Sequence, residues 1–103
     1  MPTPPVKLGL FLPPALHRRV VAGCGPRRVG QAYAQAFAAL LDRLDAGEAI
    51  TFPAVRGPKA RITIRLEPGL AARVRARIAR LNLKITDFAC TAVERALPPA
   101  PGA

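Results

Sequence analysis

The sequence contains no tryptophan, a single histidine and only six acidic residues among its 103 positions. His17 therefore has no second histidine with which to share a metal, and neither cysteine has a Cys or His at the spacing of zinc ligands. The acidic residues show no clustering suited to acid–base or metal-assisted catalysis. A glycine-rich loop with the spacing and lysine of a phosphate-binding motif is also missing. We expect a protein without catalytic activity, metal or cofactor.

Long apolar runs are scarce as well. The apolar segment near the N-terminus is interrupted by Pro13 and Pro14, and charged residues follow at once, so it does not resemble a secretory signal. No run approaches the roughly 18 apolar residues that would span a bilayer. We expect a cytoplasmic protein with no membrane partner.

Positive charge is abundant. Sixteen Lys and Arg against six Asp and Glu give a formal net charge of +10. A basic balance of this size attracts polyanions, of which nucleic acid is the first candidate and an anionic membrane surface the second. The arginines are not confined to one helix opposite a broad apolar face, which disfavours the membrane surface.

An internal repeat organises the chain. Residues 7–16 align without a gap on residues 61–70 at a constant offset of 54 (61 − 7). Apolar positions and a proline coincide: Leu8, Leu10, Leu12 and Pro14 fall on Ile62, Ile64, Leu66 and Pro68. Each copy begins with the period-two alternation of a half-buried strand and continues with the apolar spacing of helices.

The pattern predicts one strand and two helices in each copy. In the first copy, we expect a strand over 7–12, a helix over 13–22 that breaks at 23–26, and a helix over 30–45. In the second, we expect a strand over 61–66, a helix over 68–80, a turn at 82–84 and a helix over 86–97 capped by Thr86. The second helices match at an offset of 56 (85 − 29), so the second copy is two residues longer.

These elements predict one compact domain made of two units. It comprises an N-terminal tail (1–5), a first unit (6–45), a connector (46–60), a second unit (61–97) and a C-terminal tail (98–103). Gly47, Pro53, Gly57 and Pro58 argue against a helix in the connector, whose residues 50–55 are expected to lie extended against the core. One unit alone has too small a core to be stable, so the two units should pack together.

A strand and two helices in about 40 residues resemble the ribbon-helix-helix family of DNA-binding proteins, the Arc/MetJ class. The resemblance covers residues 61–97 and, more weakly, 7–45. It implies an α/β fold that is mainly helical, in which a two-stranded antiparallel ribbon and four helices form one intramolecular pseudo-dimer. The protein is therefore expected to be a monomer. In this family the ribbon enters the major groove and the N-terminus of the second helix of each unit holds a backbone phosphate.

The resemblance assigns base contacts to the outward positions of both strands, namely Lys7, Gly9, Phe11, Arg61, Thr63 and Arg65. Arginine suits this role because its fork can bond two acceptors of a guanine edge. Gly9 offers no side chain, and Phe11 is expected either to touch a thymine methyl group or to pack inward or against the connector. The DNA site is therefore expected to be asymmetric. Phosphate contacts fall on Arg28, Gly30, Lys84, Thr86 and Lys59.

The single-chain tandem form resembles the TraY-like and VirC-type accessory proteins of DNA transfer. That resemblance implies sequence-specific binding of double-stranded DNA in plasmid conjugation or T-DNA transfer, as part of a relaxosome. Partners would be a relaxase or a ParA-like ATPase, with cooperative binding on DNA as an option. The alternatives are a transcriptional repressor, a partition-type regulator and an antitoxin-like interaction module. The antitoxin is disfavoured because only residues 98–103 follow the last predicted helix.

Overall fold

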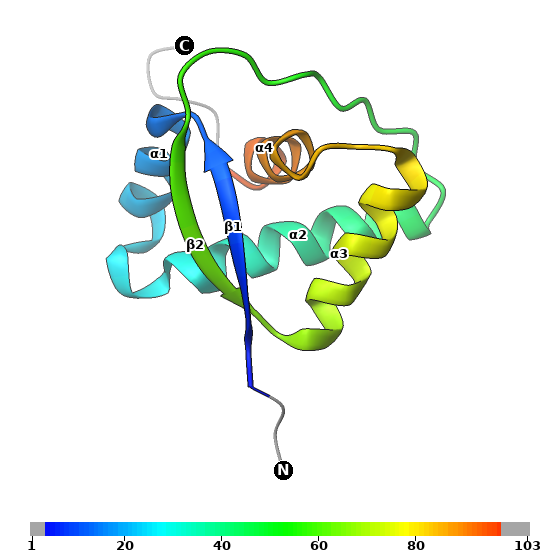
Figure 1. Ribbon diagram of the computed structural model, residues 1–103, viewed down its shortest axis with the longest axis horizontal. Helices are drawn as coiled ribbons and strands as arrows, with labels where there is room; N and C mark the ends of the chain where they lie inside the picture. Colours follow the sequence, from blue (N-terminus) through cyan, green and yellow to red (C-terminus); the bar gives the residue numbers. More distant parts are fainter. Residues whose placement is uncertain (1–3, 98–103) are drawn as a thin grey trace.

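The protein folds as a two-stranded sheet with helices packed on one side (Figure 1). The computed structural model describes residues 4–97. Its elements are β1 (Val6–Leu12), α1 (Pro14–Cys24), a 3-10 helix η1 (Pro26–Arg28), α2 (Val29–Asp45), β2 (Ala60–Leu66), α3 (Pro68–Leu81) and α4 (Ile85–Ala96). The expected mainly helical α/β class, with a two-stranded antiparallel sheet and four α-helices, is confirmed. None of the helices within 4–97 has the length and apolarity to cross a membrane.

Strands β1 and β2, together called the ribbon, pair in an antiparallel register that is symmetric about its centre. Gly9 lies opposite Thr63, and these two residues are also equivalent positions of the repeat at the offset of 54 (63 − 9). The pair Lys7–Arg65 on one side of this centre corresponds to the pair Phe11–Arg61 on the other. The register therefore relates the two halves of the repeat by an approximate two-fold symmetry.

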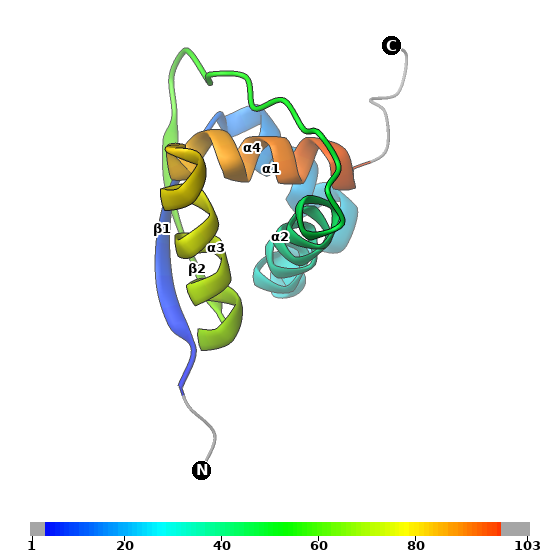
Figure 2. The same cartoon turned by 90° about the vertical axis from the view of Figure 1, so that its right-hand side faces the viewer.

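The helices cover one face of the ribbon and leave the other face free (Figure 2). Helices α2 and α4 pack against each other at the centre, and each also packs on the strand of the other half, α4 on β1 and α2 on β2. The inward side chains of Leu10 and Leu12 are fully buried beneath these helices. Phe37 and Phe88 meet edge to face between α2 and α4, with ring centroids 5.6 Å apart. Burying each such side chain stabilises the fold by about 1.5–3 kcal/mol.

Two features predicted at helix ends are wrong, namely the break after α1 and the cap of α4, and the other helix bounds differ from the prediction by at most one residue. Helix α1 continues through Gly23 to Cys24 and stops at Gly25, whose φ of 82° is a conformation that glycine adopts without steric cost. Thr86 does not cap α4, because that helix already begins at Ile85 with Lys84 as its N-cap residue. Leu81, the last residue of α3, is 41% exposed.

The connector packs on the core, as its apolar residues predict. Ile50, Phe52 and Val55 are half-buried against the core without forming a helix or strand. The ring of Phe52 stacks on Phe88 of α4, with centroids 6.2 Å apart and an interplanar angle of 13°. In Figure 1 the connector passes from the end of α2 over α4 to the start of β2.

A part-buried hydrogen bond joins α1 to α2. The Tyr33 side chain is fully buried, and its hydroxyl group lies 2.8 Å from Nδ1 of His17 in a hydrogen bond. The two rings also stack, with centroids 6.0 Å apart, so His17 packs against the core. Burial raises the pKa of Tyr33 to about 12, because the core destabilises the phenolate, and the nearby Cys90 and Cys24 thiols add to the shift.

The raised pKa predicts a loss of stability in alkali. The unfolded chain releases the Tyr33 proton near pH 10, whereas the folded protein holds it to about pH 12. The native state therefore binds more protons between these values, and the free energy of unfolding falls as pH rises through this window. Tyr33 is the only tyrosine, so the ultraviolet absorbance of tyrosinate reports it directly. A titration midpoint near pH 10 in the folded protein would contradict the burial of its hydroxyl group.

The intramolecular pairing of β1 with β2 predicts a monomer. Each half supplies one strand to the ribbon and one central helix to the core, so the chain needs no second copy to complete its sheet. Sedimentation equilibrium at micromolar concentration should give the mass of one chain. A stable dimer at that concentration would indicate that the strands pair between chains instead.

Candidate nucleic-acid interface

The free face of the ribbon gathers the six residues that the sequence assigns to base contacts. Their side chains, or the bare backbone at Gly9, point away from the helices, and all six positions are exposed: Lys7, Gly9, Phe11, Arg61, Thr63 and Arg65. The alternate residues face inward, where Leu8, Leu10 and Ile64 are buried. This separation follows from the period of two along a strand, which places neighbouring side chains on opposite faces of a sheet.

The register arranges these six residues as three cross-strand pairs with different chemistry. Lys7 lies opposite Arg65, Gly9 opposite Thr63, and Phe11 opposite Arg61. Two cations therefore stand at one end of the ribbon, a small polar pair at its centre, and an aromatic ring beside a cation at the other end. A surface of this kind is chemically asymmetric although the backbone beneath it is symmetric.

The centre of the ribbon is partly covered by Arg61. A Cβ atom added at Gly9 would lie 3.8 Å from Nε and from Nη2 of the Arg61 guanidinium. Arg61 therefore extends from its own pair toward the middle of the free face. A methyl group at position 9 would meet only ordinary van der Waals contact, so the fold itself does not require glycine there.

Phe11 remains on the free face. Its side chain is 49% exposed, so the alternative in which it packs inward is wrong. A single exposed aromatic ring is common on protein surfaces, and here it is available for contact with a ligand. Such a ring can contact the methyl group of thymine.

The first predicted phosphate site lies at the start of α2. Arg28 is the N-cap residue of this helix, and Gly30 follows in its first turn. A Cβ atom at Gly30 would lie 4.0 Å from the carbonyl oxygen of Arg65, which places this helix end beside the Lys7–Arg65 end of the ribbon. No side chain caps the helix N-terminus, and such an end attracts anions through its N–H groups and dipole.

The second predicted phosphate site, at the start of α4, has a different composition. Lys84 is the N-cap residue and is exposed, and Thr86 is half-buried in the first turn. Asp87 also lies in this turn, and its Oδ1 accepts a hydrogen bond of 3.0 Å from the backbone N–H of Val55 in the connector. The carboxylate suits the helix dipole but opposes an incoming phosphate.

Lys59 lies in the connector immediately before β2. Its side chain is exposed, and its Nζ donates a hydrogen bond of 3.2 Å to the carbonyl oxygen of Gly57. Gly57 adopts a φ of 92°, so a turn directs the chain into the strand. Lys59 lies beside the Phe11–Arg61 end of the ribbon, because the next residue, Ala60, pairs with Leu12.

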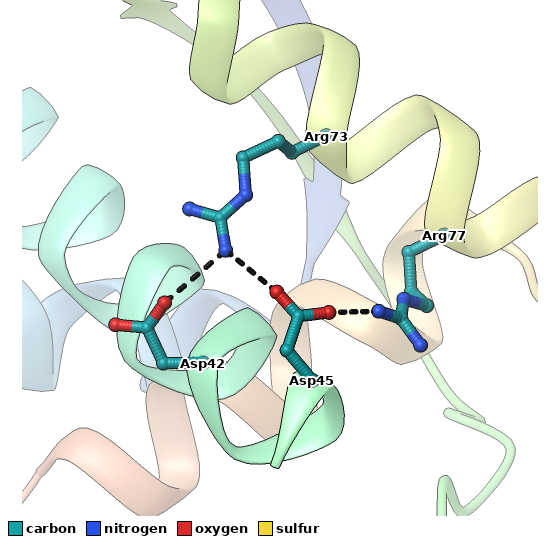
Figure 3. A network of polar contacts seen from close by, with 4 residues as sticks. All are labelled: Asp42, Asp45, Arg73 and Arg77. Carbon is teal, nitrogen blue, oxygen red and sulfur yellow. Dashed lines mark hydrogen bonds and ion pairs between the residues drawn. The ribbon is translucent and has the colours of Figure 1, made fainter. Parts of the chain in front are cut away.

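Ion pairs occupy a different part of the molecule. Asp42 and Asp45 at the end of α2 bind Arg73, and Asp45 also binds Arg77, both arginines belonging to α3 (Figure 3). Other pairs join Arg19 to Glu94, and both Arg43 and Arg95 to Glu48. The side chains are mostly exposed to solvent, so these pairs contribute little to stability.

The predicted contact residues carry cations outside these ion pairs. Within residues 4–97 no ion pair involves Lys7, Arg28, Lys59, Arg61, Arg65 or Lys84. Four of the six acidic residues are bound to arginines of the helices instead. The helices keep exposed arginines without an ion pair as well, namely Arg18, Arg75 and Arg80. The ribbon differs in that no acidic residue pairs with any of its cations within residues 4–97, so its positive charge can attract a polyanion.

An apolar groove that the sequence did not predict lies beside α1. It has a volume of about 560 Å³ and is lined by residues of the α1 start, the connector and α4, among them Pro13, Leu16, Val55 and Cys90. Burial raises the pKa of the Cys90 thiol to about 11, with smaller contributions from the nearby Asp87 and Glu94 carboxylates. Its thiolate is therefore disfavoured at neutral pH. Local periodicity cannot reveal this groove, because its three walls come from distant parts of the sequence.

Among the residues from 4 to 97, no group of three or more His, Cys, Asp and Glu side chains is placed to hold a metal ion. Comparisons of the chain with models of known protein families, with curated proteins and with solved structures find no match.

Proposed function

We propose that this protein binds double-stranded DNA by inserting the free face of the ribbon into the major groove. One observation carries the proposal. The outward positions of both strands are exposed, and the three cations among them, Lys7, Arg61 and Arg65, have no acidic partner among residues 4–97. The major groove is wide enough for a two-stranded ribbon and displays a distinct pattern of donors and acceptors for each base pair.

The proposed fold family is the ribbon-helix-helix family in a single-chain tandem form. The symmetric register supports it, because a ribbon built from two equivalent strands is what a pseudo-dimer requires. The packing of each central helix on the strand of the other half supports it too. In this arrangement the starts of α2 and α4 flank the two ends of the ribbon, where their N–H groups can bind the backbone phosphates on either side of the groove.

Each pair of the ribbon would contact DNA differently. Arg65 and Arg61 can each donate two hydrogen bonds to a guanine, and Thr63 can offer a hydroxyl or a methyl group. Phe11 can contact a thymine methyl group next to the guanine bound by Arg61. The proposed site is therefore non-palindromic, with a guanine-rich end under Lys7 and Arg65.

The ribbon arginines provide the direct test. Sequence-specific binding predicts that Arg61→Ala or Arg65→Ala costs about 1–3 kcal/mol of binding free energy at a site selected from random DNA, and relaxes base preference at one position. Both side chains are exposed and outside the core, so stability should change by less than about 0.5 kcal/mol. The measurements are fluorescence anisotropy with the selected duplex and with a scrambled one. Unchanged affinity for both duplexes in both variants would contradict base contacts by the ribbon.

A monomer on a non-palindromic site has one orientation, and this favours a role in DNA transfer. An accessory protein of a relaxosome must mark one strand for nicking, whereas a palindromic operator gives no direction. We propose a non-enzymatic, cytoplasmic accessory role beside a relaxase or a ParA-like ATPase, rather than that of a repressor, a partition-type regulator or an antitoxin. The protein should stimulate nicking by its cognate relaxase only when its binding site has the native orientation. Equal stimulation with the site inverted would exclude this role.

A further inference from the structure

The connector differs from a passive linker in both charge and packing. Residues 49–66 contain four cations and no acidic residue, and two of these cations, Arg56 and Lys59, precede the strand. Both are exposed, and neither belongs to an ion pair within residues 4–97. The equivalent positions of the first copy, at an offset of 54, are Pro2 and Pro5, so only the second copy has these charges.

Two adjacent contacts fix the connector on α4. The ring of Phe52 stacks on Phe88, and the backbone N–H of Val55 donates its hydrogen bond to Asp87. These partners are neighbours in the first turn of α4, so they hold the connector just before the two cations. Figure 2 shows the connector turning into β2 on the side of the molecule that the ribbon occupies.

The cations added by the connector compensate for a charge difference between the two ends of the ribbon. At the Val6–Leu66 end, four cations and one acid give +3: Lys7, Arg27, Arg28 and Arg65 against Glu67. At the Leu12–Ala60 end, two cations and one acid give +1: Arg61 and Lys84 against Asp87. Arg56 and Lys59 raise that second end to +3 as well.

We infer that the connector is a third phosphate-contact segment, in which Arg56 and Lys59 bind the DNA backbone beside the Phe11–Arg61 end of the ribbon. Asp87 is a positioning residue: its carboxylate holds Val55 and thereby directs the two cations toward the DNA. The inference rests on the proposed function. It assigns to the Phe11–Arg61 end of the ribbon a backbone contact by residues that have no charged equivalent in the first copy.

The charge of the connector is tested with Arg56→Gln/Lys59→Gln. Each lost phosphate contact lowers the slope of log affinity against log salt by about 0.9 for duplex DNA, so the double variant should lower the slope by roughly 2 and weaken binding roughly tenfold or more at physiological salt. The matched control is Arg43→Gln/Arg95→Gln. It removes the same charge from side chains that bind Glu48, near the ends of α2 and α4. The control variant should change the salt slope and the affinity far less than the connector variant does.

The position of the contact is tested on the DNA. Replacing phosphates by neutral methylphosphonates along one flank of the selected duplex should weaken the wild type. On that flank the same replacement should weaken the connector variant less than the wild type, because the variant has already lost the connector contact and keeps only the contact at the start of α4. On the other flank the two proteins should respond equally. An equal response of the wild type and the connector variant on both flanks would place the connector away from the DNA.

The role of Asp87 is tested by comparing Asp87→Asn with Asp87→Ala. Both variants lose the charge, but only asparagine keeps an oxygen that can accept the hydrogen bond from Val55. The alanine variant should therefore bind severalfold more weakly and with a smaller salt slope, a change that a simple loss of stability would not produce. Identical affinity and slope for the two variants would overturn the positioning role.

These outcomes distinguish a failure of the connector contact from a failure of DNA binding by the ribbon. If the wild type binds the selected duplex and Arg61→Ala weakens that binding, the proposed function stands. If Arg56→Gln/Lys59→Gln then matches the control in affinity and slope, the connector inference alone fails. If the wild type shows no preference for the selected duplex and Arg61→Ala has no effect, the proposed function fails first.

Discussion

The antiparallel pairing of β1 with β2 is the interaction on which the rest of the structure depends. The two strands are separated by the whole of α1, α2 and the connector, so their pairing closes a long loop at an entropic cost. Burial of apolar side chains beneath the ribbon offsets this cost, because Leu10, Leu12 and Leu66 are all removed from water by α2 and α4. A sheet of two strands has little stability without such packing.

The same pairing creates the free face. Since four helices suffice to cover one side of so narrow a sheet, the other side stays in solvent with its six outward positions. The paired acidic residues follow this division. Acidic residues at the end of α2 and along α4 bind the arginines that face them, whereas the ribbon carries cations without such partners among residues 4–97. The account of DNA binding rests on the exposed outward positions of the ribbon and on the absence of acidic partners for its cations within residues 4–97, not on net charge alone.

Much of the fold follows from local patterns in the sequence. The alternation through Ile62, Ile64 and Leu66 predicts β2, and the prolines at 14 and 68 mark the starts of α1 and α3. The exposed positions of the ribbon follow from the same alternation. The end of α1 does not follow from a local pattern, because two glycines stand close together in the sequence. In the structure Gly25, just before Pro26, adopts the positive φ, and Gly23 does not.

Local sequence patterns do not predict contacts between segments that are far apart in the chain. The sequence indicates that the connector is not helical and that its apolar residues face the core, but it does not show that Val55 meets Asp87, 32 residues later. Nor does it give the register, which depends on where the helices of the two halves meet. Local propensity also fails at Thr86: a good capping residue lies inside the helix, because packing of Ile85 against the core extends α4 by one residue.

The central claim is that the free face of the ribbon contacts DNA, and the most direct measurement is the change in backbone amide NMR shifts during titration with the selected duplex. The account predicts the largest changes at residues 7–11 and 61–65, followed by the starts of α2 and α4, with one chain bound per duplex. Changes concentrated around the apolar groove of α1 and α4, with the ribbon amides unmoved, would contradict it.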